Sequence, residues 1–264
     1  MNSTDLKDRL DFAVAAARAA GAHTLRYFQQ SGVAVERKSD ASPVTVADRE
    51  AEQLMRASIA ARYPDDAVLG EELGETAGAS GYRWILDPID GTKSFVCGVP
   101  LYATLIGLEH EGSSVLGVIG IPALDEFVFA ARGLGAWHTQ GQSSPKPAKV
   151  SGKSSLAEGI FVTSEVKTFD EHQRRAAFDR LQSAAWVTRT WGDGYGYLMV
   201  ATGRAELMVD PKMSIWDAAA LQPVIEEAGG RFTDWSGRAT IYSGEAIATN
   251  GLVHAEALKL AGDQ

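Results

Sequence analysis

Cysteine is almost absent from this sequence: only one of the 264 residues, Cys97, is a cysteine. A single cysteine excludes an internal disulfide bond and a zinc site built from several thiolates. It also indicates a reducing compartment, so we expect the protein to be cytoplasmic. We expect Cys97 itself to be a small buried side chain rather than a nucleophile, because the sequence identifies no partner that would activate it.

Positive charge and long apolar segments are scarce as well. The sequence has 25 lysines and arginines against 34 aspartates and glutamates, a net charge of −9, so it lacks the basic face that binds nucleic acid. No apolar run reaches membrane-spanning length, and the N-terminus lacks the pattern of a signal peptide. We therefore predict no nucleic-acid or membrane partner. A small phosphate substrate is not excluded, because metal ions can reverse the local field.

Several familiar catalytic motifs are missing. The five histidines are scattered, and none lies at metal-ligand spacing from another histidine, a cysteine or an acid. The sequence has neither the G-x-S-x-G elbow of serine hydrolases nor a Walker phosphate loop, and the glycines from Gly192 to Gly196 lack the spacing of the dinucleotide fingerprint. These absences direct attention to the acidic residues.

The periodicity of apolar residues predicts helices and strands in both halves of the chain. Strands in the first half follow one another as an antiparallel run rather than as an alternating βαβ series. Residues 139–151 predict a linker or long loop, and we expect two parts, 1–145 and 146–264. The predicted helices cover about residues 4–30, 45–62, 171–183, 195–202, 216–229 and 253–260, and the main predicted strands cover 33–38, 101–109, 115–121, 126–131, 134–138, 160–163, 186–189, 205–209, 231–234 and 246–249.

The stretch WILDPIDGT at residues 84–92 is the strongest candidate for a catalytic or metal-binding segment. Its apolar start indicates a buried strand, which places Asp87 at the strand's end and Asp90 on a rigid turn beyond Pro88. Two carboxylates at this spacing can share hard cations. The backbone could add a carbonyl oxygen and two phosphate-binding amides, from Ile89, Gly91 and Thr92. Spacing alone nevertheless favours an ordinary surface turn, because Asp-Pro and Asp-Gly are common turn pairs.

Two other acids precede this corner. Asp48 lies in the first turn of the predicted helix 45–62, where a carboxylate is electrostatically favoured, so its position alone favours a structural role. Glu71 follows a short apolar segment and begins an acidic pair with Glu72, which usually indicates a solvated turn. Glu71 lies sixteen residues before Asp87, close enough to return to the same site across one hairpin.

Taken together, three signatures resemble the inositol monophosphatase superfamily, whose members are magnesium-dependent, lithium-sensitive phosphomonoesterases. The signatures are Gly70-Glu71-Glu72, then Asp87-Pro88-Ile89-Asp90-Gly91-Thr92, then Trp216-Asp217 followed by Glu227-Ala228-Gly229-Gly230. The resemblance extends over nearly the whole chain, and residues 90–95, 98–100, 192–197 and 232–235 are most similar to bacterial histidinol-phosphate phosphatases. It implies an α/β protein, an αβαβα five-layer sandwich, that forms a homodimer.

The resemblance also implies a site for two or three Mg²⁺ ions. The first ion would be held by Glu71, Asp87 and the carbonyl of Ile89, the second by Asp87, Asp90 and Asp217, and a third would contact Glu71 through water. Asp48 and Thr92 would orient the attacking water, with Glu71 also in the catalytic set. The amides of Gly91 and Thr92 would hold the phosphate, and Asp193, Asp210 and Arg189 would contact the alcohol. Lys38 lies near the expected metal-site loop, but we leave it out of the catalytic set because that loop looks about one residue shorter than in the animal enzymes.

The implied reaction is hydrolysis of L-histidinol phosphate in histidine biosynthesis. Asp193 and Asp210, with the aromatic residues Trp191 and Tyr195, would suit a cationic and planar group. Inositol-1-phosphate is the alternative substrate, because the same acids could accept hydrogen bonds from hydroxyl groups. Bisphosphorylated substrates are less favoured, since no basic cluster is evident for a second phosphate. A non-catalytic metal-binding homologue is a further alternative.

Overall fold

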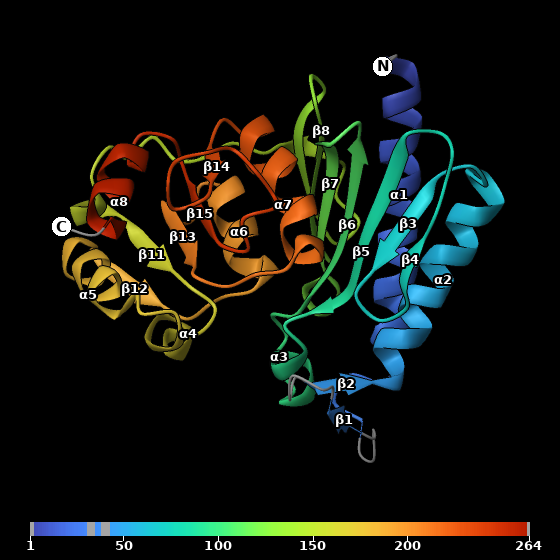
Figure 1. Cartoon of the computed structure of the whole chain (residues 1–264), viewed down its shortest axis with the longest axis horizontal. Helices are drawn as coiled ribbons and strands as arrows, with labels where there is room; N and C mark the ends of the chain where they lie inside the picture. The colour runs from blue at the N-terminus through green and yellow to red at the C-terminus, as the bar shows by residue number, and fades with distance from the viewer. Residues whose placement is uncertain (1–2, 31–34, 38–42, 263–264) are drawn as a thin grey trace.

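The computed structural model describes residues 3–30, 35–37 and 43–262 (Figure 1). Two sheets and three groups of helices form five alternating layers, so the predicted αβαβα sandwich of the α/β class is confirmed. In Figure 1 the layers run from α1 and α2, through the large sheet, α6 and α7, and the small sheet, to α4, α5 and α8. Among the described residues, no helix combines the length and the apolar character needed to cross a membrane.

The large sheet has eight strands in the order β10-β9-β8-β7-β6-β5-β3-β4. All neighbours are antiparallel except β3 and β5, which are parallel, so the predicted hairpin between Glu71 and Asp87 is wrong. The chain instead turns back through the edge strand β4, whose exposed residues Gly74–Thr76 carry no apolar pattern. The strands are β3 (Ala67–Gly70), β4 (Gly74–Thr76), β5 (Tyr82–Asp90), β6 (Ala103–His110), β7 (Ser113–Ile121), β8 (Glu126–Ala131), β9 (Gly135–Gln140) and β10 (Lys146–Pro147).

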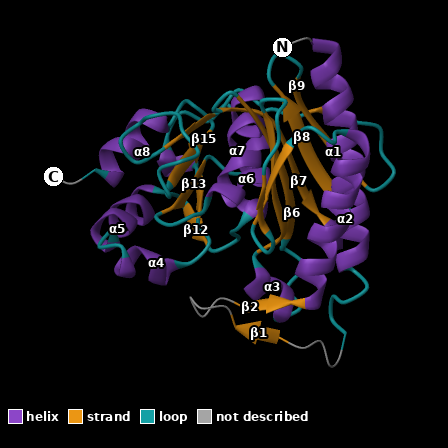
Figure 2. Ribbon diagram, turned by 45° about the vertical axis from the view of Figure 1, so that its right-hand side comes forward, coloured by secondary structure: helices purple, strands orange, loops and turns teal. Residues whose placement is uncertain are grey.

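Helices α1 (Ser3–Thr24) and α2 (Val46–Arg62) cover the outer face of this sheet (Figure 2). Leu6, Leu10, Ala13 and Ala17 of α1 are buried there. The helix predicted to reach residue 30 ends at Thr24, whose buried hydroxyl donates to the Gly21 carbonyl at 2.8 Å. The chain then continues through tighter turns, with bonds such as Tyr27 N–H to the Thr24 carbonyl, because local side-chain bonding competes with the helix.

The small sheet has the order β12-β11-β13-β15-β14 and is covered on its outer side by α4, α5 and α8. The helix predicted at 171–183 is confirmed from residue 175 onward as α5, but its predicted start is wrong. Gln173, with φ +58°, separates α5 from the shorter helix α4, since a left-handed residue ends an α-helix. These elements are β11 (Ile160–Val162), α4 (Val166–Glu171), α5 (Arg175–Ala184), β12 (Val187–Arg189), α6 (Gly194–Ala201), β13 (Leu207–Asp210), α7 (Ile215–Glu227), β14 (Arg231–Thr233), β15 (Ala246–Thr249) and α8 (His254–Ala261).

Two further expectations differ from the structure. The predicted loop 139–151 contains β10, which pairs with β9 at the edge of the large sheet, so it is partly a strand. The division into 1–145 and 146–264 stays a prediction.

Cys97 is exposed rather than buried, because it ends α3 (Thr92–Val96), a short surface helix that buries only Phe95. Short strands β1 (Val35–Arg37) and β2 (Pro43–Thr45) pair nearby. Lys38 lies outside the described residues.

Close packing of α7 on the large sheet fixes the position of its first turn. A Cβ atom added at Gly107 would lie 2.6 Å from the Ala219 Cβ, and one at Gly117 would lie 1.9 Å from the Ala220 carbonyl oxygen. Both separations are far below van der Waals contact, so only glycine at these strand positions lets α7 approach this closely. The approach carries Asp217, in the first turn of α7, to the end of β5.

Candidate active site

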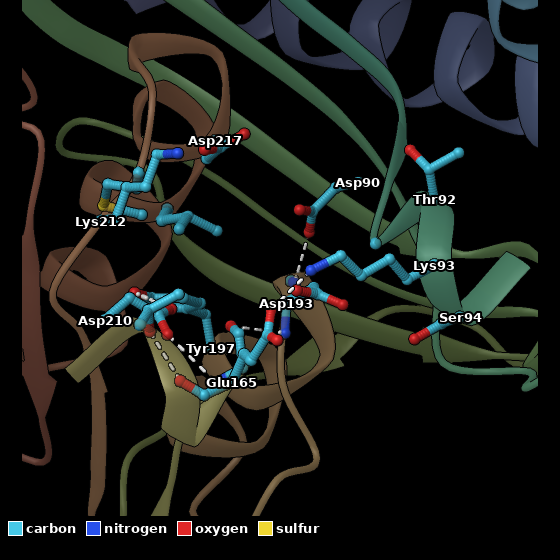
Figure 3. A pocket seen from close by; sticks show the side chains of 16 residues that line it. Asp90, Thr92, Lys93, Ser94, Glu165, Asp193, Tyr197, Asp210, Lys212 and Asp217 are labelled. Atoms are coloured by element: carbon cyan, nitrogen blue, oxygen red, sulfur yellow. Dashed lines mark hydrogen bonds and ion pairs between the residues drawn. The ribbon is translucent and has the colours of Figure 1, made fainter. Parts of the chain in front are cut away.

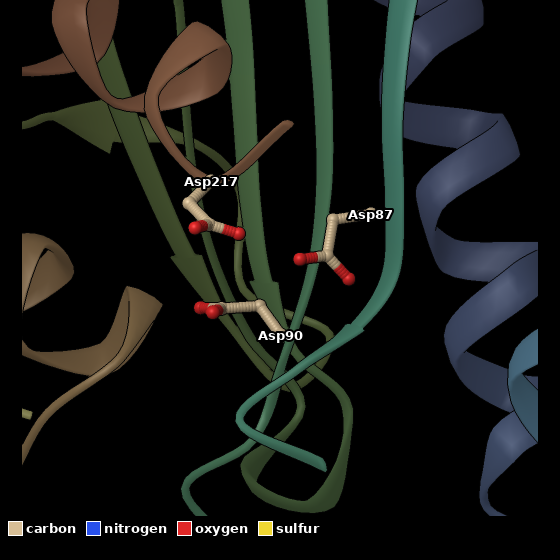
Figure 4. A group of neighbouring side chains, drawn as sticks. All are labelled: Asp87, Asp90 and Asp217. Atoms are coloured by element: carbon tan, nitrogen blue, oxygen red, sulfur yellow. The ribbon is translucent and has the colours of Figure 1, made fainter. Parts of the chain in front are cut away.

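Three carboxylates from two distant segments converge at the end of β5. Asp87 and Asp90 come from the strand and Asp217 from the first turn of α7, and each offers an oxygen atom within 4.8 Å of the others (Figure 4). Asp87 is buried, whereas Asp90 and Asp217 are half-buried. The structure therefore brings together the three acids expected to hold the second metal ion.

The strand end that carries these acids has an irregular register and is held by hydrogen bonds. The register of β5 against β6 shifts between Asp87 and Asp90, which frees this stretch from the regular hydrogen-bond ladder. The Ile89 amide donates to the Asp87 carboxylate at 3.1 Å, and the Thr104 hydroxyl donates to the Pro88 carbonyl at 2.9 Å. The corner therefore holds its acids in fixed directions.

Two acids of the site are presented by helix starts of the same kind. Asp48 and Asp217 each occupy the third position of a helix and accept from the backbone amide of the capping residue, Thr45 or Ser214, at 2.8 and 2.6 Å. Such a capping box holds a carboxylate at a defined angle to its helix. The Thr45 hydroxyl also donates to Asp48 at 2.6 Å.

The electrostatics of the acid cluster suit the binding of a cation. Burial, followed by the charges of Glu71, Asp90 and Asp217, raises the pKa of Asp87 well above its usual value. Burial also raises the pKa of Asp90 well above its usual value, with the charges of Asp193 and Asp217 adding to the effect. Burial raises the pKa of Asp217 to about 7, and the charge of Glu71 acts in the same direction. Within the described residues, no lysine or arginine forms an ion pair with any of the three.

The donor chemistry fits Mg²⁺. The cluster offers carboxylate oxygens without any histidine or cysteine, and hard divalent cations prefer such ligands. A bound cation would neutralise the repulsion among the acids. Glu71 lies outside the closest group, although its charge raises the pKa of Asp48 as well as those of Asp87 and Asp217. Its predicted part in the first metal position therefore stays a prediction.

Each member of the expected water-orienting pair has a hydrogen-bond partner in the structure. The Thr92 hydroxyl donates to the Ile89 carbonyl at 3.1 Å, and Asp48 is bonded to Thr45. Asp48 is almost completely buried, and its burial is the main reason that its pKa is raised. An aspartate with a raised pKa retains a proton more readily than an exposed one.

A cavity of about 370 Å³ opens beside the acids (Figure 3). Among the predicted residues it is lined by Asp90, Gly91, Thr92, Asp193, Asp210 and Asp217. Arg189 is not among its lining residues; it lies on the exposed part of β12 with its guanidinium 5.9 Å from the ring centre of Trp191. Trp191 and Tyr195 do not line the cavity either, and the roles proposed for these three residues stay predictions.

The sequence did not single out several other lining residues, notably Lys93, Ser164, Glu165, Tyr197 and Lys212. Tyr197 is buried and donates to the Asp210 carboxylate at 2.9 Å. The Ser164 amide donates to the other oxygen of Asp210 at 3.1 Å. Tyr197 lies in the aromatic stretch after Gly192, so its identity was visible, but the face of α6 that meets the cavity depends on where the helix begins.

Asp193 occupies a strained position on the cavity wall. Its backbone has φ +49° and ψ −149°, a region that costs a non-glycine residue roughly 1–3 kcal/mol. The Ser164 hydroxyl accepts from the Asp193 amide at 3.0 Å, and the following amide, of Gly194, donates to Asp90. Burial and the charge of Asp210 raise the pKa of Asp193 to about 6. The strain is consistent with a side chain retained for function rather than for stability.

We expect Gly91→Ala to damage both stability and activity. Gly91 has φ +80°, and an added Cβ would lie 2.4 Å from an Asp193 carboxylate oxygen. The variant should lose roughly 1–3 kcal/mol of unfolding free energy and at least about tenfold in kcat/KM for a phosphate ester, because Asp193 must shift. Chemical denaturation and steady-state kinetics would measure these losses.

Gly133→Ala is the matched control for that variant. Gly133 has a similar φ of +75°, but an added Cβ would meet nothing within 4 Å. It should show only the cost of the left-handed backbone and full activity. Equal kinetic losses in both variants would contradict a special role for the contact between Gly91 and Asp193.

Comparisons with known proteins agree with this geometry. The model of the inositol monophosphatase family matches residues 5–263. A histidinol-phosphatase from Chlorobaculum parvum is 44% identical over 238 residues, which are 90% of this chain and 90% of that protein. A histidinol-phosphatase from Mycobacterium tuberculosis is 39% identical and covers 95% of this chain and 96% of its own. The crystal structure of the extragenic suppressor protein suhB from Bartonella henselae superposes with a TM-score of 0.89 at 28% identity, covering 97% and 99% of the two chains.

Proposed function

This chain belongs to the inositol monophosphatase family, and on that basis we propose that it hydrolyses L-histidinol phosphate to L-histidinol and inorganic phosphate. It is a phosphoric monoester hydrolase. The observation that carries the substrate assignment is the pair of relatives named histidinol-phosphatase, at 44% and 39% identity over at least 90% of the chain. The proposed pathway role, in histidine biosynthesis, follows from the same relatives.

The cavity supports a cationic substrate on chemical grounds. Histidinol phosphate carries a dianionic phosphate at one end and an amine and an imidazole at the other. The wall of the cavity also holds Asp193, beside Gly91, and Asp210, at the end of β13. Acidic groups stabilise a protonated amine or imidazole more than they stabilise a neutral alcohol, so the wall favours histidinol over inositol.

We propose that the enzyme needs Mg²⁺ and that two or three ions bind per site. Asp87, Asp90 and Asp217 would hold one ion, and Glu71, Asp87 and the Ile89 carbonyl would hold another. When bound, Mg²⁺ supplies Lewis-acid charge that stabilises the negative charge developing on the phosphoryl oxygens. The uncompensated acid cluster, with its raised pKa values, supports this assignment.

The protein's own residues would align the reaction. The amides of Gly91 and Thr92 would hold the phosphate, and the Thr92 hydroxyl and Asp48 would orient the attacking water, with Glu71 close by. Water attacks phosphorus as the bond to the alcohol oxygen breaks; Asp48 takes up the proton that the water loses, and the leaving alkoxide takes a proton from solvent. Burial raises the pKa of Asp48, which makes its carboxylate a better acceptor for a proton from that water.

Phosphate release tests the substrate assignment. With Mg²⁺ present, the purified protein should show a kcat/KM for L-histidinol phosphate at least about tenfold above that for inositol-1-phosphate, the difference that one good polar contact provides. Higher activity on inositol-1-phosphate would instead support an inositol monophosphatase, in which Asp193 and Asp210 accept hydrogen bonds from hydroxyl groups. Absence of Mg²⁺-dependent release from any phosphate ester would leave a non-catalytic metal-binding protein.

The remaining properties expected from the resemblance are proposals too. We propose a lithium-sensitive enzyme that works in the cytoplasm as a homodimer. Inhibition by LiCl in the phosphate-release assay and a molar mass from light scattering would check the first and last of these.

A further inference from the structure

We propose that Glu165 selects the alcohol part of the substrate by binding a protonated nitrogen. Before substrate binds, Lys93 forms an ion pair with Glu165. This inference rests on the proposed function, since it concerns a zwitterionic phosphate ester. It adds a specificity residue that neither the resemblance nor the acid cluster indicates. Substrate binding would exchange one ion pair within the protein for contacts at both charged ends of the ligand.

The ion pair connects two segments of the cavity lining. Lys93 belongs to α3, one residue after the proposed phosphate-binding amides, and Glu165 precedes α4 on the opposite wall. The Lys93 Nζ lies 2.5 Å from a Glu165 carboxylate oxygen, and both residues line the cavity (Figure 3). Glu165 is therefore placed to meet the part of a ligand that extends away from the phosphate end.

Glu165 is held in place without using its carboxylate. It occupies the capping position of α4, yet its side chain makes no capping hydrogen bond. Its backbone carbonyl accepts from the Thr168 hydroxyl at 2.6 Å. The backbone of Glu165 is thus held in place. Among the described residues, its carboxylate accepts a hydrogen bond from Lys93.

The pair is easy to displace. The side chains of Lys93 and Glu165 are 70% and 41% exposed, and an ion pair this accessible to water contributes little to stability. A ligand that brings its own cation can therefore take over Glu165 at small cost, leaving Lys93 beside the phosphate end. A neutral alcohol offers no such replacement, so breaking the pair would leave a carboxylate without a cation.

The local charge balance favours the same ligand. Asp193 lies close enough to both residues that the charge of Lys93 lowers its pKa and the charge of Glu165 raises it. The cavity as a whole is lined by two lysines, Lys93 and Lys212, and by five acids, Asp90, Glu165, Asp193, Asp210 and Asp217. A protonated nitrogen on the alcohol part of the substrate would restore the balance.

Steady-state kinetics of Glu165→Gln on two substrates test the inference. The KM for L-histidinol phosphate should rise roughly fivefold, the loss expected for one partly exposed ion pair, while kcat stays within about twofold. The KM for inositol-1-phosphate should not change. Glu165→Lys should raise the KM for L-histidinol phosphate further, because it places a positive charge opposite the substrate cation.

Glu171→Gln is the matched control. Glu171 lies on the same helix and pairs with Lys167 at 3.0 Å, with side chains 50% and 74% exposed, but it does not line the cavity. This variant should leave both KM values unchanged. Thermal unfolding of every variant should match the wild type, since all the replaced side chains are exposed.

The possible failures are distinguishable. If the wild type prefers L-histidinol phosphate but Glu165→Gln changes neither KM, or changes both equally, the inference about Glu165 is wrong and the proposed function stands. If the wild type releases no phosphate from L-histidinol phosphate, the proposed function fails and the inference fails with it.

Discussion

Asp87→Asn should abolish phosphatase activity and, in the absence of metal, make the protein more stable. Asparagine keeps the size of the side chain and an oxygen that accepts from the Ile89 amide, so the corner should keep its shape. It removes one negative charge from a cluster whose members lie within 4.8 Å of one another. Loss of a ligand expected to bridge two ions should lower kcat by roughly a thousandfold or more.

The stability gain follows from the same cluster. Asp87 is buried, and its pKa is raised by burial and by the charges of three neighbouring acids, so its ionised form opposes folding at neutral pH. Removing that charge should raise the unfolding free energy in EDTA by about 1–3 kcal/mol. Denaturation in EDTA and in Mg²⁺, together with phosphate release, would measure both effects on one preparation.

Asp234→Asn is the informative control, because it should behave in the opposite way. Asp234 is also buried, but it accepts hydrogen bonds from Ser236 and Arg238, which outweigh its burial and lower its pKa. Its replacement should reduce stability and leave activity nearly unchanged, since Asp234 does not line the cavity. Near wild-type turnover by Asp87→Asn would refute the proposed metal site.

Local sequence patterns predicted the strand that carries Asp87, but not the whole corner. The apolar run predicted a buried strand, and the structure shows one. The surface turn that spacing alone favoured is wrong, because β5 continues through Asp90 and Asp87 is buried within it. The helix starts that present Asp48 and Asp217 also had a visible signal, because Thr45 and Ser214 stand three residues before each acid. Local signals of this kind survive folding because neighbours in the sequence create them.

The convergence of these segments was not visible in local patterns. Asp217 reaches β5 because Gly107 and Gly117 let α7 lie directly on the sheet, and glycine within a strand gives no indication of its partner. Glu71 reaches the site along a strand parallel to β5, an arrangement that the short polar strand β4 concealed. The family resemblance supplied what local periodicity could not.

The cavity wall was the least predictable part. Tyr195 and Tyr197 lie two residues apart on one short helix, and only Tyr197 faces the cavity. Which of the two faces it depends on the start of α6 at Gly194, which follows the left-handed backbone of Asp193. Sequence rarely indicates such a conformation for aspartate. The same limit applies to Glu165, whose partner Lys93 lies far away in the sequence.

Removal of Mg²⁺ should destabilise the protein, and the size of the loss should grow with pH. Asp217 has a pKa of about 7 in the folded protein against 3.8 for an ordinary aspartate. Between these values the folded state holds more protons than the unfolded state, so the unfolding free energy falls as pH rises. For Asp217 the full loss is about 2–4 kcal/mol, the lower figure allowing for its partial exposure. Asp87 and Asp90 contribute in the same direction.

The difference between unfolding temperatures in Mg²⁺ and in EDTA isolates this effect. His254, whose pKa is lowered to about 4 mainly by burial, destabilises the folded state as pH falls below 6.5, but it does so equally with and without metal. Mg²⁺ competes with protons for the carboxylates, so the difference should be small near pH 5 and reach about 5–10 °C near pH 8. In Asp87→Asn it should be much smaller at every pH. If the difference between the two unfolding temperatures stays constant from pH 5 to pH 8, Mg²⁺ binds away from these acids. Metal binding and proton binding exclude each other only at a site built from groups that titrate in this range.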